Sequence, residues 1–335
     1  MPLKRQARSI FPIITVLFLL GSINFIFATG YFIAYGKLYR VNLGKLDVNK
    51  VGEFHKTSKY LSVAPNGLVW SRLSLKSIGG VDPVRGIVSA RINLPYRPYR
   101  IAILENGKAC ISHQILIKKG IPLSLVDVES EKYLETLFGL DGLVTDMAVN
   151  ASEAFIATYR LSKPRGLSLY RLNFRKGNED VSLSKLLENN IADARYEISI
   201  YGGILYLVLI PGRNSGVESK ITLLNARSGE RLGVIAGEAL GEVAKLRGKP
   251  VFSRDTGYFT CIGEDGRNGI GLLSTKNRRV SKILPVKGKI YRIVSVEGHM
   301  LSYMNIQPYM GKGELAIFFY DTMAGKEVKR IRILP

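Results

Sequence analysis

Cysteine and histidine are scarce in this sequence of 335 residues. There are two cysteines, Cys110 and Cys261, and three histidines, His55, His113 and His299. Two cysteines in a chain of this length do not make a disulfide framework, and no CxxC spacing occurs. We therefore predict neither a zinc site built from cysteine and histidine nor a histidine-rich metal site.

Acidic residues are also few. The chain has 27 Asp and Glu against 48 Lys and Arg, which gives a formal net charge of +21 and a pI near 9.9. This excess favours a polyanionic neighbour such as anionic lipid headgroups, an anionic cell-envelope polymer or nucleic acid. The positive residues are spread along the whole chain, so a solvated basic surface without a specific partner is an alternative. Nucleic acid is the weakest candidate, because clustered basic residues and aromatic platforms are missing.

Catalytic motifs are absent as well. The sequence has no GxSxG elbow, no HExxH, no P-loop and no Rossmann glycine pattern followed by a helix. We therefore predict no catalytic residue, no cofactor site and no metal site, and expect that the protein is not an enzyme. The segment "GEDGRNGIG", Gly263–Gly271, lacks the alternating ligands and the terminal Glu of an EF-hand. A hairpin connection is favoured there over a calcium site.

A long apolar run opens the chain. Residues Ile10–Ala28 carry no charge and follow Lys4, Arg5 and Arg8. Such a segment is long enough to cross a hydrocarbon core of about 30 Å. We predict a single transmembrane helix within residues 1–30 that acts as an uncleaved signal anchor, with a cleaved signal peptide as the alternative. Basic residues before the span predict a cytoplasmic N-terminus and an extracytoplasmic main domain.

One hairpin pattern recurs along the rest of the chain. It consists of an apolar strand, an Asp or Asn, three residues, a Gly and a second strand, and its last copy is "FFYDTMAGKEVKRIRI". The copies, some of them degenerate, place their turn pairs at Asp82/Gly86, Asp127/Glu131, Asn173/Gly177, Asn225/Gly229, Ser274/Arg278 and Asp321/Gly325. Successive copies are 45 to 52 residues apart, a regularity typical of repeat architectures. The turn carboxylates are explained by Asx-turns, in which they accept backbone N–H bonds.

Each repeat has room for four strands. In the second repeat these are Arg100–Leu104, Ala109–Gln114, Leu123–Val128 and Tyr133–Leu137. Asn106-Gly107 joins the first two and reads as a hairpin turn in which both central residues need positive φ. Four short antiparallel strands in each repeat describe propeller blades. We predict an all-β protein, a six- to seven-bladed β-propeller preceded by one N-terminal transmembrane helix.

The predicted organisation has three parts. Residues 1–30 are the anchor, residues 31–59 are a stalk or a first partial blade, and residues 60–335 are the propeller. Seven blades are favoured, because the chain after the anchor divides into seven units of about 44 residues. Cys110 and Cys261 both fall on second strands, three blades apart, so we predict two buried free thiols and no disulfide between them. The fourth strand of each blade is expected to carry charge that prevents edge pairing, as Lys329, Arg330 and Arg332 do in the last copy.

These units resemble the YVTN-type β-propeller repeats of bacterial and archaeal surface proteins, which are similar in fold to quinoprotein amine dehydrogenases. The segment "VDPVRGIVSARINLPYRPYRIAILENGKACI" has that repeat's Asp-turn-Gly hairpin, a proline entering the inner strand at Pro98, and the Asn-Gly turn. The resemblance covers roughly residues 60–335. The tetrapeptide that names the family is absent, and "FIATY" and "YFTCI" take the equivalent strand. Such a resemblance implies a fold far more than an activity.

The expected function is that of a membrane-anchored extracytoplasmic binding or scaffold module for a protein or an anionic envelope partner. The alternative that the resemblance implies is a propeller enzyme, either a lactonase-like hydrolase or a quinone-dependent dehydrogenase. The segment "PYRPYR" interleaves Tyr with Arg, a combination that can stack on and neutralise an anionic ligand. A structural role at the link between two blades is the other interpretation. We predict Arg97 and Arg100 as ligand-binding residues.

Overall fold

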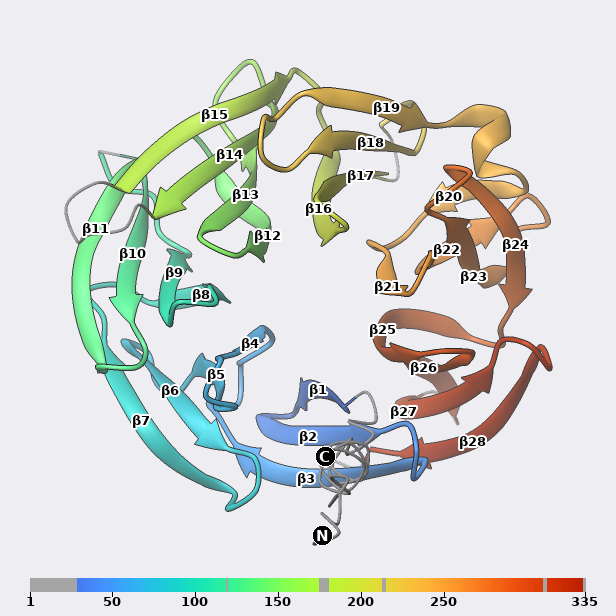
Figure 1. The fold of residues 1–335 in the computed structure, drawn as a ribbon, viewed down its shortest axis with the longest axis horizontal. Helices are drawn as coiled ribbons and strands as arrows, with labels where there is room; N and C mark the ends of the chain where they lie inside the picture. The colour runs from blue at the N-terminus through green and yellow to red at the C-terminus, as the bar shows by residue number, and fades with distance from the viewer. Residues whose placement is uncertain (1–28, 119, 175–180, 213–214, 310–311, 334–335) are drawn as a thin grey trace, which may run out of the picture.

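The computed structural model describes residues 29–118, 120–174, 181–212, 215–309 and 312–333. They form seven antiparallel sheets that stand radially around one axis, so the fold is a seven-bladed β-propeller (Figure 1). The predicted anchor, Ile10–Ala28, lies outside the described residues. Of the residues that are described, none belongs to a helix with the length and hydropathy needed to cross a membrane.

The blades follow one another in chain order. Blades 1 and 2 contain β1 (Thr29–Ala34), β2 (Lys37–Asn42), β3 (Asp47–Glu53), and β4 (Leu61–Val63), β5 (Val69–Arg72), β6 (Ser77–Asp82), β7 (Ile87–Asn93). Blades 3 and 4 contain β8 (Pro98–Ile103), β9 (Lys108–His113), β10 (Ile121–Asp127), β11 (Lys132–Leu140), and β12 (Leu143–Asn150), β13 (Glu153–Arg160), β14 (Gly166–Phe174), β15 (Val181–Asn189). Blade 5 contains β16 (Ala194–Tyr201), β17 (Ile204–Pro211), β18 (Lys220–Asn225) and β19 (Arg231–Ile235). The short 3-10 helix η1 (Gly237–Leu240) leads into blade 6, which contains β20 (Val243–Leu246), β21 (Val251–Ser253), β22 (Thr256–Gly263), β23 (Asn268–Ser274) and β24 (Arg279–Pro285). Blade 7 contains β25 (Lys289–Glu297), β26 (Met300–Tyr309), β27 (Lys312–Asp321) and β28 (Lys326–Arg332).

Blade 1 is built from the segment that the sequence left open between a stalk and a partial blade. Asn42 accepts the backbone N–H of Lys45 at 2.9 Å, and Leu46 has a φ of 49°. This is the hairpin of the other repeats in a seventh form, with Asn42 at the first position and Leu46 in place of the Gly. In the other blades this hairpin joins the third and fourth strands. In blade 1 it joins β2 and β3, so β2 and β3 are the third and fourth strands and β1 is the second.

The turn geometry explains why the repeat tolerates so much sequence change. The fifth residue of the turn has positive φ in every copy whose turn is described, namely Leu46 (49°), Gly86 (74°), Glu131 (55°), Gly229 (78°), Arg278 (52°) and Gly325 (65°). The first residue supplies a side-chain oxygen: Asp82 accepts Val84 N–H at 2.8 Å, and Asp321 accepts Met323 N–H at 2.9 Å. The Asx-turn interpretation is confirmed. The turn at Asn173 runs into residues 175–180, which lie outside the description.

Two local expectations are corrected. The Asn106-Gly107 turn has positive φ only at Gly107, at 74°, because Leu104 and Lys108 close a wider loop in which Asn106 accepts the Lys108 N–H at 3.1 Å. Charge does not protect every outer strand either. The outer strand β28 is charged and exposed as expected, but β7 exposes Ile87.

Seven hydrophobic clusters fill the interfaces between neighbouring blades, one at each interface. The cluster that closes the ring joins Phe32 and Val41 of blade 1 to Ile317, Phe319 and Ile333, which belong to the end of the chain. Within the described residues, β28 pairs only with β27, so blades 1 and 7 meet through side-chain packing and share no strand. Burial of this apolar surface is the main force that holds such a ring together.

The two cysteines lie where the blade assignment put them. Cys110 is on β9 and Cys261 is on β22, the second strands of blades 3 and 6, and the two blades stand on opposite sides of the ring (Figure 1). Both thiols are buried, and burial raises the pKa of each to about 12.

Candidate anion-binding site

Polar and charged side chains gather at one end of the ring, near its axis. Within a blade the first strand begins, and the second strand ends, on the same face, because consecutive strands run antiparallel. The beginning of β8, the end of β5 and the loops that precede β4 and β8 therefore come together. We call this end of the ring the entrance face.

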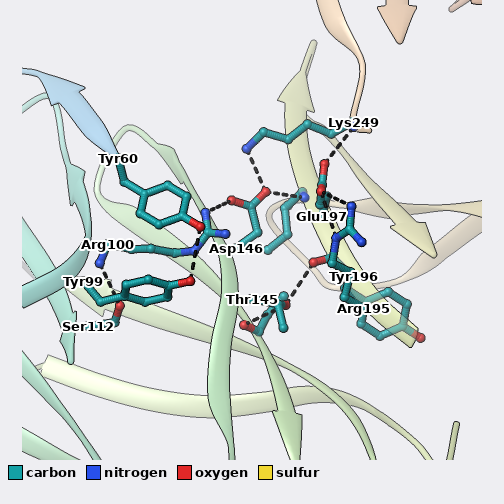
Figure 2. Close-up of polar contacts among 12 residues, drawn as sticks. Tyr60, Tyr99, Arg100, Ser112, Thr145, Asp146, Arg195, Tyr196, Glu197 and Lys249 are labelled. Atoms are coloured by element: carbon teal, nitrogen blue, oxygen red, sulfur yellow. Dashed lines mark hydrogen bonds and ion pairs between the residues drawn. The ribbon is translucent and has the colours of Figure 1, made fainter. Parts of the chain in front are cut away.

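Asp146 on β12 is the centre of a polar network that spans several blades. Its Oδ1 accepts a hydrogen bond from Arg100 Nη1 at 2.8 Å, and its Oδ2 accepts from Lys249 Nζ at 2.7 Å and from the backbone N–H of Ile198 at 2.9 Å. Figure 2 shows Arg100 and Lys249 approaching the carboxylate from opposite sides. Burial alone would raise the pKa of Asp146, but Lys249, Arg100 and the hydrogen bonds outweigh burial and hold that pKa below its usual value. The carboxylate is thus a paired, structural anion.

Two tyrosines enclose Arg100. Its guanidinium carbon lies 3.9 Å from the centre of the Tyr60 ring and 5.7 Å from that of Tyr99, within cation–π range, and Figure 2 shows it between the two rings. The two hydroxyl oxygens are 3.2 Å apart. Burial, the largest effect, raises the pKa of Tyr60 to about 12, so this phenol is protonated at neutral pH. Arg100 is therefore held in place by an ion pair and by stacking.

A second carboxylate on the same face is also paired. Glu197 on β16 accepts from Arg195 Nε at 3.1 Å and from the backbone N–H of Lys249 at 3.0 Å (Figure 2). Lys249 lies in the loop between β20 and β21, where the inner strand of blade 6 is interrupted. This interruption carries the lysine side chain to Asp146.

Arg72 is a cation of this face that has no carboxylate beside it among the described residues. Arg72, at the end of β5, is only 7% exposed, and its Nη2 lies 3.1 Å from Nδ1 of His55. Nδ1 of His55 also receives the backbone N–H of Thr57 at 3.3 Å, so it is the unprotonated nitrogen of a neutral ring. Burial first, and then the charges of Arg72, Arg97 and Lys56, lower the pKa of His55.

Arg97 extends this cluster from the next blade. Burial and then the charge of Arg97 lower the pKa of Arg72, so the two guanidinium groups repel each other. His113 fixes the backbone at this point, because its Nδ1 donates to the carbonyl of Arg97 at 3.1 Å and its Nε2 accepts from Ser124 at 2.8 Å. Burial lowers the pKa of His113 to about 4, so its ring is neutral.

Arg292 on β25 is a further cation near the axis. Burial lowers its pKa, and the only side-chain contact found for it among the described residues is the one from its Nε to Met304 Sδ at 3.3 Å. A thioether is a weak acceptor for a guanidinium. Like Arg72, Arg292 therefore has no carboxylate partner among the described residues.

The structure separates the two arginines that the sequence singled out. Arg100 is committed to Asp146, whereas Arg97 is exposed and lies in the group with Arg72 and His55. Sequence reasoning missed Asp146 and Arg72. Each left a signal, since both are charged residues inside otherwise apolar strands, "LVTDMAVN" and "VWSR".

The predicted hairpin at Gly263–Gly271 is present. Residues 264–267 connect β22 to β23, and Asp265 accepts the backbone N–H of Arg267 at 2.9 Å. Across the described part of the chain, no three His, Cys, Asp or Glu side chains come together in a group that could hold a metal ion. His299 lies in the turn between β25 and β26, and its carbonyl accepts from Thr322.

The fold and this face define the class of protein, a seven-bladed β-propeller with a basic entrance face. No family model matches the sequence, and the search of curated proteins returns no match. Solved structures do match in fold. One is the dihydro-heme d1 dehydrogenase NirN, with a TM-score of 0.56 and 14% identity over 92% of this chain and 73% of that one.

Two further matches show how widely this fold is shared. BamB from Moraxella catarrhalis has a TM-score of 0.51 and 11% identity, covering 90% of this chain and 82% of its own. Hydrazine synthase of Kuenenia stuttgartiensis has a TM-score of 0.53 and 13% identity, covering 82% of this chain and 95% of its own. At such identities the likeness shows the propeller fold and leaves the activity open.

Proposed function

We propose that this protein is a membrane-anchored, extracytoplasmic binding module that uses the entrance face to hold an anionic group of a protein or envelope partner. The observation that carries the proposal is the buried cation Arg72, which has no carboxylate partner among the described residues and lies near a second cation, Arg97. A buried charge without a counter-charge is unfavourable, and a bound anion removes that penalty. The predicted ligand residues Arg97 and Arg100 both belong to this face.

The anchor and the repeat family are parts of the same proposal. Residues 10–28 hold the propeller to the membrane, with the N-terminus cytoplasmic. We propose that the blades are of the YVTN type, because their turn pattern is similar to the pattern of that repeat. A partner that is itself an envelope component then meets the entrance face at short range, where electrostatic attraction is least screened.

Capture from solubilised membranes tests this function. Three proteins are compared: the full wild-type chain, the double variant Arg72→Met/Arg97→Gln, and the control Lys282→Gln/Lys329→Gln. The control is matched because each double variant removes two positive charges. We expect the wild type and the control to recover the same protein or polymer and the arginine variant to lose it. Equal recovery by all three, or no recovery by any, contradicts the proposal.

An enzymatic role is the alternative, as a lactonase-like hydrolase or a quinone-dependent dehydrogenase. NirN and hydrazine synthase share the fold, and so does BamB. No arrangement of side chains on the entrance face favours either chemistry over binding. We therefore propose a non-catalytic role, without a resident cofactor, and nucleic acid remains the least favoured partner.

A further inference from the structure

Arg72 and Arg100 are both enclosed arginines of the entrance face, but only Arg100 has a carboxylate partner among the described residues. Arg100 has Asp146, at 2.8 Å, and a tyrosine ring on its flank. The Nε atoms of Arg72 and Arg100 both lack a hydrogen-bond partner, so the difference lies in the counter-charge. Arg72 is only 7% exposed, and among the described residues the one side chain that hydrogen-bonds its guanidinium is His55. A buried charge without a counter-charge is unfavourable, so its presence calls for an explanation.

We infer that Arg72, Arg97 and His55 form a binding site for a tetrahedral oxyanion, that is, a phosphate or sulfate group. This site deepens the proposed function, on which it rests, by naming the chemical group that the entrance face recognises. Arg72 comes from the second strand of blade 2, His55 from the loop before β4, and Arg97 from the loop before β8. The anion therefore sits where two adjacent blades meet.

The donors fit an anion with several oxygens and more than one negative charge. A guanidinium presents a planar fork of N–H groups that matches a phosphate or carboxylate edge. Arg72 and Arg97 come from different elements, the end of β5 and the loop before β8, and two such forks can occupy more oxygens than the two of a carboxylate. Their combined charge of two also matches a phosphate dianion. Lys56, exposed beside His55, adds a third positive charge to the surroundings.

The backbone around the site is fixed before any ligand arrives. The carbonyl of Arg72 accepts from Ser58 Oγ at 2.6 Å and from the His55 N–H at 3.2 Å, which fastens the loop to the strand. On the other side, His113 holds the carbonyl of Arg97, and the Tyr96 ring packs edge-on against His113. Preorganised donors bind more tightly, because less ordering remains to be done on binding. His113 is therefore a positioning residue for this site.

A thermal-shift titration of the full chain in detergent micelles tests the site. Inorganic phosphate is titrated against chloride at constant ionic strength, and we expect the wild-type Tm to rise by several degrees at saturation. Arg97→Gln should need at least about tenfold more phosphate, as expected when a charged hydrogen-bonding partner is lost. Lys282→Gln, which removes a charge from the outer strand β24, should respond like the wild type.

Arg72→Met separates a ligand-binding arginine from a structural one. Methionine fills similar space without the charge, so we expect a Tm in chloride equal to or above that of the wild type, and no rise with phosphate. A lower Tm in chloride together with an unchanged phosphate response would overturn the inference. If Arg72→Met does not fold, equilibrium titration of Arg97→Gln decides alone, and an affinity equal to the wild type overturns it.

Two further arms separate the source of the phosphate group. Vesicles containing phosphatidylglycerol test a lipid headgroup, and soluble polyphosphate tests a polymer. Phosphate binding that depends on Arg72 and Arg97, without capture of any membrane or envelope partner, would leave the site established and refute the proposed function. Capture that survives loss of phosphate binding would refute the site and leave the proposed function standing.

Discussion

At the residue scale, the pairing of each buried charge distinguishes scaffold from site. Asp146 is 4% exposed and receives hydrogen bonds from blades 3, 5 and 6, so its role is to join them. Arg72 is 7% exposed, and among the described residues the only side chain that hydrogen-bonds its guanidinium is the neutral imidazole of His55. The charge of Asp146 is neutralised by groups of the protein itself, whereas we propose that the charge of Arg72 is neutralised by a bound anion.

Removal of the Asp146 charge should destabilise the ring. In Asp146→Ala, Arg100 and Lys249 lose their shared counter-ion, and breaking a buried pair in this way costs about 3 kcal/mol or more in unfolding free energy. Chemical denaturation measures the effect. Asp82→Ala also removes a carboxylate near an arginine, but the Arg85 side chain there is 75% exposed and only the Asx-turn of one hairpin is lost with it, so a smaller loss is expected. Equal destabilisation by both variants would contradict the role given to Asp146.

Stability should fall between neutral and mildly acidic pH because of His113. Unfolded histidine binds a proton near pH 6.5, whereas burial lowers the folded pKa of His113 to about 4. The stabilisation is therefore complete above pH 6.5 and is lost as the pH falls toward 4, by roughly 3 kcal/mol in total. Denaturation of the wild type at pH 7 and pH 5, beside His113→Gln, measures this. A pH dependence that is unchanged in His113→Gln would show that the histidine is not buried as described.

The sequence singled out two residues of the entrance face, Arg97 and Arg100, for a definite physical reason. Arg97 and Arg100 stand out because Tyr and Arg alternate around them, a local pattern visible in one segment. Asp146, Arg72 and Lys249 come from three separate blades, and only the closed ring brings them to one face. Their proximity depends on topology, which no local pattern contains.

At the scale of the element, the third-to-fourth-strand hairpin is the unit that repeats. Its requirement is conformational, a side-chain oxygen at the first position and positive φ at the fifth, and residues other than Asp and Gly can meet it. This is why the sequence revealed the copies with Asp82 and Asp321 but missed Asn42, whose partner at positive φ is Leu46. The strand pattern between the turns was predictable, because alternation and apolar runs encode burial directly.

Gly325→Ala tests the conformational requirement alone. At Gly325 φ is 65°, and an added Cβ would meet no atom within 4 Å, so there is no clash to confuse the result. We expect a loss of about 1 kcal/mol in unfolding free energy from backbone strain. Gly325→Asn is the matched control, since Asn tolerates this conformation and should lose less. An alanine variant as stable as the wild type would contradict the turn assignment.

At the scale of the whole molecule, closure of the ring depends on packing between its first and last blades. Blade 1 meets blade 7 through Phe32, Val41, Ile317 and Phe319, without a strand exchanged between them. Seven blades rather than six follow from the Asn42 hairpin. The ring brings the inner strands to one axis and so creates the entrance face.

Phe319→Ala should weaken that closure. Phe319 is fully buried in the cluster that joins blades 1 and 7, and a Phe-to-Ala change in a core typically costs about 3–5 kcal/mol. Hydrogen exchange should show the largest loss of protection in blades 1 and 7. Tyr291→Ala, at a side chain that is 59% exposed, serves as the control and should leave protection unchanged. Loss of protection confined to other blades would contradict closure through this cluster.

The proposed membrane anchor is tested separately from the fold. Protease added to intact protoplasts should degrade the propeller, since we propose that it lies outside the cytoplasm with residues 10–28 as the span. Lysed protoplasts provide the control for protease access and activity. Full protection in intact protoplasts, followed by digestion after lysis, would overturn the orientation.

The central claim is that the entrance face binds an oxyanion through Arg72 and Arg97. A crystal of the protein soaked in tungstate, a heavy tetrahedral anion, tests it most directly through anomalous diffraction. We predict an anomalous peak within hydrogen-bond distance of both guanidinium groups. Tungstate bound only at other basic residues, with this position empty, would contradict the claim.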